Sequence, residues 1–184
     1  NFELTNNDER ILKDTFELLR ESALGQIQVP VHRDYHSRNI MVLKDNSLGI
    51  IDFQDAVQGA ITYDLVSLLR DCYISWPQEK VHNWVKSYFA KAKKAQIIGA
   101  ISEQQFILWF DWMGLQRHIK VAGIFARLAI RDGKQDYLND IPLTLSYIVE
   151  VSAQYDALSE FHMWLQTRLL PKINMDLPVL GEVS

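Results

Sequence analysis

Residues 31–56, VHRDYHSRNIMVLKDNSLGIIDFQDA, combine short apolar runs with His, Arg, Asp and Asn side chains that are costly to bury. The runs NIMVLK and LGIIDF are separated by DNS, a turn composition, and together predict a β-hairpin. Asn39 enters the first strand and Asp52 leaves the second, so the hairpin should bring the two side chains close together. Such a pair of oxygen ligands can chelate Mg²⁺, which prefers hard oxygen donors and keeps positions free for phosphates.

A further carboxylate, Asp34, precedes Asn39 by five residues, which is loop distance from that metal. An Asp in this position can accept the proton of an attacking hydroxyl group while the metal neutralises charge on a transferred phosphoryl group. The segment therefore predicts a phosphoryl-transfer site, with Asp34 as base and Asn39 and Asp52 as Mg²⁺ ligands. The alternative is a surface hairpin with a polar turn, in which Asp34 only caps that turn.

Helices must position this hairpin, because the rest of the chain has apolar residues mainly at helical spacing. Thr5 and Asp8 have capping-box spacing, so a helix should begin there, bury Ile11, Leu12, Phe16 and Leu19, and end near Gly25. Further helices are expected at residues 62–74, 75–92 and 102–131, the last of which can stop at Gly133, and from about Pro142. The apolar residues of the 75–92 helix follow the i, i+3, i+4, i+7 spacing of a buried stripe: Val81, Trp84, Val85, Tyr88, Phe89 and Ala92. We expect a single α+β domain over residues 1–184, predominantly α, with strands only between residues 31 and 54.

Composition excludes several classes of function. A formal net charge of −4 without any Lys/Arg block gives no footprint for a nucleic-acid backbone, so nucleic acid is not an expected partner. Cys72 is the only cysteine and cannot form an internal disulfide. No apolar run is long enough to cross a bilayer or to resemble a signal peptide, so we expect no membrane association and a cytoplasmic location.

Two motifs carry a resemblance to a known family. HRDYHSRN fits the pattern H-x-D-x-H-x-x-N, and IIDFQDA fits I-D-F/W-x-x-A. Together they resemble the aminoglycoside phosphotransferase and choline kinase family, which has a protein-kinase-like fold. His36 and Gln54 depart from the usual protein-kinase pattern and favour a small-molecule kinase. The resemblance implies ATP as the phosphoryl donor, Mg²⁺ as the metal and a small molecule as the acceptor.

The resemblance also suggests roles for residues around the motifs. GAITYDL supplies Gly59 and Asp64 at the spacing of the family residue that braces the catalytic loop from behind the site. We expect His32 to fix the loop by hydrogen bonds rather than to transfer a proton. His36 could orient either the loop or Asp52. Asp55 could assist a second metal ion or cap a following helix.

A second block, residues 109–142, resembles a narrower bacterial branch of that family. This branch contains cytoplasmic kinases of peptidoglycan recycling, which phosphorylate the anomeric hydroxyl of the amino sugars N-acetylmuramate and N-acetylglucosamine. Asp111, Arg117 and His118 are polar groups within an apolar helix and need partners, so they are candidates for the acceptor pocket. Trp112 could stack on a sugar, whereas Trp109 and Phe110 are expected in the core.

The segment before His32 contains no glycine-rich phosphate loop and no phosphate-binding Lys followed by a helical Glu partner. We therefore expect the chain to be the C-terminal lobe of a two-lobed kinase, without the N-terminal nucleotide-binding lobe and inactive alone. Apolar residues around the hairpin should then be unusually exposed, or covered by a crystal or dimer contact. Two other possibilities are an aminoglycoside- or choline-type kinase and a non-catalytic pseudokinase that binds a partner.

Overall fold

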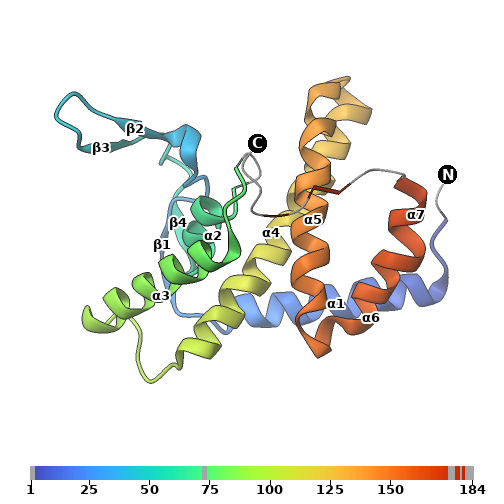
Figure 1. Ribbon diagram of the computed structural model, residues 1–184, viewed down its shortest axis with the longest axis horizontal. Coiled ribbons are helices and arrows are strands. Elements are labelled where there is room, and N and C mark those ends of the chain that lie inside the picture. Colours follow the sequence, from blue (N-terminus) through green and yellow to red (C-terminus); the bar gives the residue numbers. More distant parts are fainter. Residues whose placement is uncertain (1–2, 72–73, 174–176, 179, 181–184) are drawn as a thin grey trace. The chain divides into compact units, whose positions relative to one another are not determined.

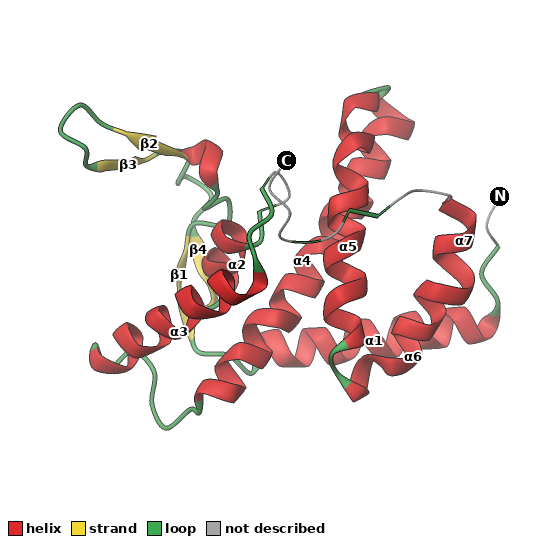
Figure 2. Ribbon diagram, in the orientation of Figure 1, coloured by secondary structure: helices red, strands yellow, loops and turns green. Residues whose placement is uncertain are grey.

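The computed structural model describes residues 3–71, 74–173, 177–178 and 180. The expected helix over 62–74 therefore falls partly, and Cys72 wholly, outside the described residues. The architecture is predominantly helical with two small antiparallel sheets (Figures 1 and 2). Residues Ala23–Gly114 form one compact unit. The described residues up to Ser22 and those from Leu115 to Leu180 form another.

The unit Ala23–Gly114 contains both sheets. Strand β2 (Ile40–Val42) pairs with β3 (Leu48–Ile50), which confirms the expected hairpin. Strand β1 (Gln28–Val31) pairs with β4 (Val57–Ala60). The expectation that strands occur only between residues 31 and 54 is therefore wrong. The sequence VQGA of β4 has no apolar alternation, and its pairing depends on the distant β1.

Gly59 permits the close approach of β1 and β4. A Cβ atom at this position would lie 2.6 Å from Cγ2 of Val31, which is itself buried. Because Val31 is β-branched and stiff about χ1, it cannot easily move away from such a contact. The glycine thus has a packing function beside its place in the GAITYDL motif.

Three helices complete the core of this unit: α2 (Tyr63–Leu69), α3 (Gln78–Lys94) and the first part of α4 (Glu103–Asp132). The expected stripe of α3 is buried at Val81, Val85, Phe89 and Ala92, and it packs with Phe106 and Phe110 of α4. Trp84 of the same stripe departs from the expectation, since 38% of it is exposed. Polar groups also join this core: the buried Gln26 accepts a 2.7 Å hydrogen bond from Oγ1 of Thr62.

The other unit contains most of α1 (Asn6–Leu24), the remainder of α4, and α5 (Ile141–Ala153). The 3₁₀ segments η2 (Gln135–Asp140) and η3 (Asp156–Leu158) precede α5 and α6 (Ser159–Trp164). A π-helical segment, η4 (Leu165–Leu169), leads into α7 (Leu170–Ile173). As expected, α4 ends before Gly133, whose φ is 67°, and Pro142 lies in the first turn of α5.

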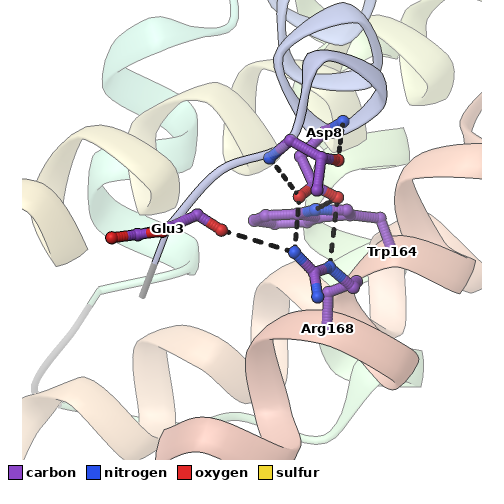
Figure 3. Close-up of polar contacts among 5 residues, drawn as sticks. Glu3, Asp8, Trp164 and Arg168 are labelled. Carbon is purple, nitrogen blue, oxygen red and sulfur yellow. Dashed lines mark hydrogen bonds and ion pairs between the residues drawn. The ribbon is translucent and has the colours of Figure 1, made fainter. Parts of the chain in front are cut away.

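The predicted capping box of α1 is confirmed and also anchors this unit. The amide of Asp8 donates to Oγ1 of Thr5 at 3.2 Å, and the amide of Thr5 donates to Oδ2 of Asp8 at 2.9 Å. Asp8 further accepts hydrogen bonds from Nε1 of Trp164 at 2.9 Å and Nη2 of Arg168 at 2.7 Å (Figure 3). The Arg168 guanidinium holds the pKa of Asp8 well below its usual range. Phe16, expected on the buried face of α1, is instead 48% exposed.

Within the described ranges, none of the helices has both the length and the apolar character required to cross a membrane.

Candidate active site

The loop between β1 and β2 carries the first motif, and the beginning of α2 holds it. Oδ2 of Asp64 accepts a hydrogen bond from the amide of His32 at 2.6 Å, and Oδ1 accepts one from the amide of Arg33 at 3.0 Å. Arg33 has φ 77°, a left-handed conformation that is uncommon outside glycine. Strained residues of this kind persist where surrounding contacts hold them, often at functional sites. Asp64 thus fixes the backbone immediately before Asp34.

His32 joins the loop to the chain that follows the hairpin. Its Nε2 lies 2.9 Å from the carbonyl oxygen of Ile51, so this nitrogen carries the proton and donates. Its ring also packs edge-on against Tyr35, with 5.9 Å between centroids. These contacts favour the structural role expected for His32 over proton transfer.

Asn39 and Asp52 lie at the base of the hairpin. The carbonyl oxygen of Asn39 accepts a hydrogen bond from the amide of Ile51 at 3.1 Å, which extends the β2–β3 ladder to the residue beside Asp52. Nδ2 of Asn39 donates to the carbonyl oxygen of Asp34 at 2.9 Å, which turns the amide nitrogen toward the loop. Asp52 has φ 66°, and its Oδ1 accepts a 2.7 Å hydrogen bond from Nε2 of Gln54.

This donor set fits Mg²⁺ better than a transition metal. No group of three or more His, Cys, Asp or Glu side chains within the described part of the chain is arranged to hold a metal ion. One carboxylate and one amide oxygen are a usual protein contribution to a Mg²⁺ that also binds water and substrate phosphates. Asn39 and Asp52 are therefore the residues that could hold it.

Two other carboxylates of the motifs, Asp34 and Asp55, are exposed. Asp34, the proposed base, is exposed, and its carbonyl oxygen accepts the amide of His36 at 3.0 Å. Both roles considered for His36 stay predictions. Asp55 is exposed in the turn before β4. Since a strand follows it, the suggestion that Asp55 caps the next helix is wrong, and its assistance to a second metal stays a prediction.

The acceptor candidates on α4 are deeply placed. In the unit Ala23–Gly114, Asp111 is 1% exposed, and its Oδ1 accepts a 2.6 Å hydrogen bond from Nη2 of Arg70, which is also buried. The Arg70 guanidinium lies 4.8 Å from the centroid of the Phe110 ring, and Gly114 leaves it space, since a Cβ there would be 3.1 Å from Nη1. These contacts favour a structural role for Asp111, and the neighbouring Trp112 is buried as well.

Arg117 and His118 belong to the other unit. His118 is 1% exposed and stacks on Tyr147, with 4.5 Å between ring centroids and 2° between ring planes. Arg117 is half-buried. The proposal that these polar groups bind an acceptor stays a prediction, and the stacking of His118 is a second explanation for its burial.

Sequence reasoning missed one polar contact of the loop. Oγ of Ser37 donates to Oδ2 of Asp71 at 2.9 Å, which connects the loop to the end of α2. Both residue types are common outside functional sites, and 34 positions separate them, so no local pattern pointed to the pair.

The β2–β3 hairpin extends away from β1, β4 and α2 (Figure 1). Its apolar side chains are exposed as expected, including Val42 at 71% and Leu48 at 62%, and so is Phe53 just after it, at 67%. This confirms the expected exposure and marks an apolar surface next to Asn39 and Asp52.

The chain is similar to three proteins named N-acetylmuramate/N-acetylglucosamine kinase. The one from Neisseria meningitidis is 45% identical over 163 residues, which cover 89% of this chain and 48% of that protein. Those from Pseudomonas putida and Pseudomonas aeruginosa are 46% and 45% identical over 144 residues, which cover 78% of this chain and 42% of each relative. The chain thus spans about half the length of the curated relatives it matches.

The family model described as "Phosphotransferase enzyme family" matches residues 3–99. The matched region includes the loop that Asp64 holds, the hairpin and Asp52. The chain belongs to the phosphotransferase enzyme family.

Proposed function

We propose that the chain is the kinase-like C-terminal lobe of an ATP-dependent phosphotransferase whose acceptor is an amino sugar. The observation that carries this proposal is the loop itself: Asp64 holds the amides of His32 and Arg33, and Asn39 holds the carbonyl oxygen of Asp34. These contacts fix both sides of an exposed carboxylate without using its oxygen atoms. A carboxylate so placed is available to an acceptor hydroxyl group.

In the proposed reaction, an oxygen atom of the acceptor hydroxyl attacks the γ-phosphorus of ATP. The bond from that phosphorus to the bridging oxygen breaks, ADP leaves with the bond electrons, and Asp34 takes the hydroxyl proton. Asn39 and Asp52 would hold Mg²⁺, which supplies positive charge against the phosphates when bound. Asp64 and His32 act on the loop rather than on the substrates.

The named activity of the relatives supports N-acetylmuramate or N-acetylglucosamine as the acceptor. We propose transfer to the anomeric oxygen, as part of cytoplasmic peptidoglycan recycling. An aminoglycoside- or choline-type acceptor would require an acidic surface for a cation. A pseudokinase role would require loss of a base or metal residue, whereas Asp34, Asn39 and Asp52 are all present.

Residues 1–184 should not complete the nucleotide site alone. The chain spans about half the length of its relatives, and the hairpin beside Asn39 and Asp52 presents uncovered apolar side chains. In two-lobed kinases the N-terminal lobe grips the phosphates. We therefore propose very weak ATP binding and no phosphoryl transfer by residues 1–184 alone. Calorimetry that finds tight ATP binding to this chain would contradict the proposal.

The test of the reaction uses the complete gene product with ATP and Mg²⁺. ADP release and loss of the sugar's reducing end should both depend on N-acetylmuramate or N-acetylglucosamine. A product that retains its reducing end would contradict anomeric transfer. Activity confined to aminoglycosides or choline would contradict the sugar assignment. If none of the acceptors tested causes ADP release, the kinase assignment is contradicted.

A further inference from the structure

A pocket of about 460 Å³ opens beside the loop that carries Asp34, within the unit Ala23–Gly114. This volume is within the range that accommodates small molecules. Its lining is mostly apolar, with a few polar groups. The lining residues that matter to its chemistry are Ser37, Asp71, Trp76, Trp84, Tyr88 and Lys91.

The pocket adjoins the proposed catalytic loop at two points. Ser37 lines it, three residues after Asp34, and is held there by its 2.9 Å hydrogen bond to Asp71. A second pocket of about 260 Å³ is lined by Tyr35, Asp64, Leu65, Leu68 and Tyr88 among others. The last three of these residues line both pockets, which are therefore neighbours. A ligand in this space would lie along the loop that contains Asp34.

Two indole rings form one side of the pocket. Trp76 and Trp84 meet edge to face with 5.5 Å between their centroids, and 38% of Trp84 is exposed although it lies on the stripe expected to be buried. Large aromatic rings that stay accessible in a concave site offer flat apolar surface and a polar N–H group. Such surfaces suit the C–H face of a sugar ring and the methyl group of an acetamide.

Lys91 supplies positive charge to the same pocket. It follows Trp84 and Tyr88 at helical spacing on α3, so the three side chains share one face. No carboxylate of the described residues forms an ion pair with Lys91, whereas Lys86 on the same helix lies 3.7 Å from Glu103. An ammonium group next to aromatic surface is suited to a ligand that combines an apolar ring face with a carboxylate.

We propose that this pocket is the acceptor site and that Lys91 binds the carboxylate of an N-acetylated amino sugar acid. Trp76 and Trp84 contact the ring and its acetamide, and the Ser37–Asp71 pair joins the pocket to the loop of Asp34. The inference rests on the proposed function and deepens it, because Lys91 then favours N-acetylmuramate, which has a lactyl carboxylate, over N-acetylglucosamine, which has none.

The test compares Lys91→Met with the wild-type complete gene product in assays of both sugars. A charge-assisted hydrogen bond is lost only for the acid, so kcat/KM for N-acetylmuramate should fall about tenfold further than that for N-acetylglucosamine. Lys91→Glu should widen the difference. Lys94→Met is the matched control, since this lysine lies on the same helix outside the pocket lining and should leave the ratio unchanged.

A binding measurement separates the pocket from the chemistry. N-acetylmuramate should quench tryptophan fluorescence of the wild type, and Trp84→Leu should weaken its apparent affinity about tenfold. Equal loss for both sugars in Lys91→Met, or unchanged kinetics, would overturn the role of Lys91. Unchanged binding in Trp84→Leu would overturn the location. A wild type that transfers phosphate to neither sugar would instead contradict the proposed function.

Discussion

Asp64 and Asp111 are carboxylates on two helices of the same unit, but they hold different parts of it. Asp64, which is half-buried, accepts hydrogen bonds from backbone amides of the loop before Asp34. Asp111 accepts the guanidinium of Arg70 in the core, where both residues are at least 97% buried. The first contact fixes the position of a loop, and the second compensates a buried charge. Changes at the two sites should therefore separate activity from stability.

The largest expected effect is at the loop that Asp64 holds. Asp34→Asn in the complete gene product should lower kcat by about 10²–10⁴-fold, because no base then takes the proton of the sugar hydroxyl group. Thermal stability should change little, since Asp34 is exposed. Asp14→Asn, another exposed carboxylate, is a control expected to retain activity. Turnover of Asp34→Asn within threefold of the wild type would contradict the assignment of the base.

Removal of Asp111 should instead destabilise the fold. Asp111→Ala leaves the Arg70 charge buried without its carboxylate, which costs about 3–5 kcal/mol of unfolding free energy. Chemical denaturation measures this loss. The double change Arg70→Met with Asp111→Leu should recover much of it, because replacement of both charges by apolar groups is often neutral. If Asp111→Ala loses activity but not stability, that result would instead support the prediction that Asp111 belongs to the acceptor pocket.

Asp64→Asn should have an intermediate effect on activity. The Asn side chain can accept a hydrogen bond from one loop amide but presents its NH₂ group to the other. The second amide therefore loses its partner, which costs about 1–3 kcal/mol of unfolding free energy. We expect kcat to fall about 10–100-fold, with a smaller change in stability than for Asp111→Ala. If the two variants lose stability equally while Asp64→Asn stays fully active, the distinction between the two carboxylates fails.

A matched pair of valines tests the contrast between the hairpin and the core. Val85 is 0% exposed and Val42 is 71% exposed. Val85→Ala should cost about 2 kcal/mol of unfolding free energy through lost burial and a cavity. Val42→Ala should change it by no more than about 0.5 kcal/mol in residues 1–184. A larger loss for Val42→Ala there would mean that the hairpin is covered in solution, for example by a second copy.

The smallest expected effect concerns pH and the surroundings of the Arg70–Asp111 pair. Burial lowers the pKa of His82, with Asp111 opposing this shift and Arg70 and Lys86 adding to it. The unfolded chain therefore takes up the His82 proton at higher pH than the folded chain. Stability should be fully present above the unfolded pKa and decline as pH falls toward the lower folded value. His82→Gln should flatten this part of the curve in denaturation series, and an unchanged curve would contradict the effect.

Local patterns in the sequence determined most of the elements. The capping box of Thr5 and Asp8, the apolar spacing of α3, the stop at Gly133 and the turn between β2 and β3 each involve residues close in the chain. The same holds for the order of Asp34, Asn39 and Asp52, whose proposed roles follow from residue type and spacing and stay predictions. The ATP and Mg²⁺ cofactors, the amino-sugar acceptor and the cytoplasmic location of the enzyme likewise stay proposals.

Only the tertiary structure decided which distant groups meet. The β1–β4 pair, the Ser37–Asp71 contact and the Arg70–Asp111 ion pair join residues separated by 26 to 41 positions. The residue types in these contacts are compatible with many partners, because a carboxylate can accept hydrogen bonds from an amide, a hydroxyl or a guanidinium group. Packing of α2, α3 and α4 selects one partner for each. The same packing leaves Trp84 accessible beside Lys91, although helical periodicity alone had assigned Trp84 to the core.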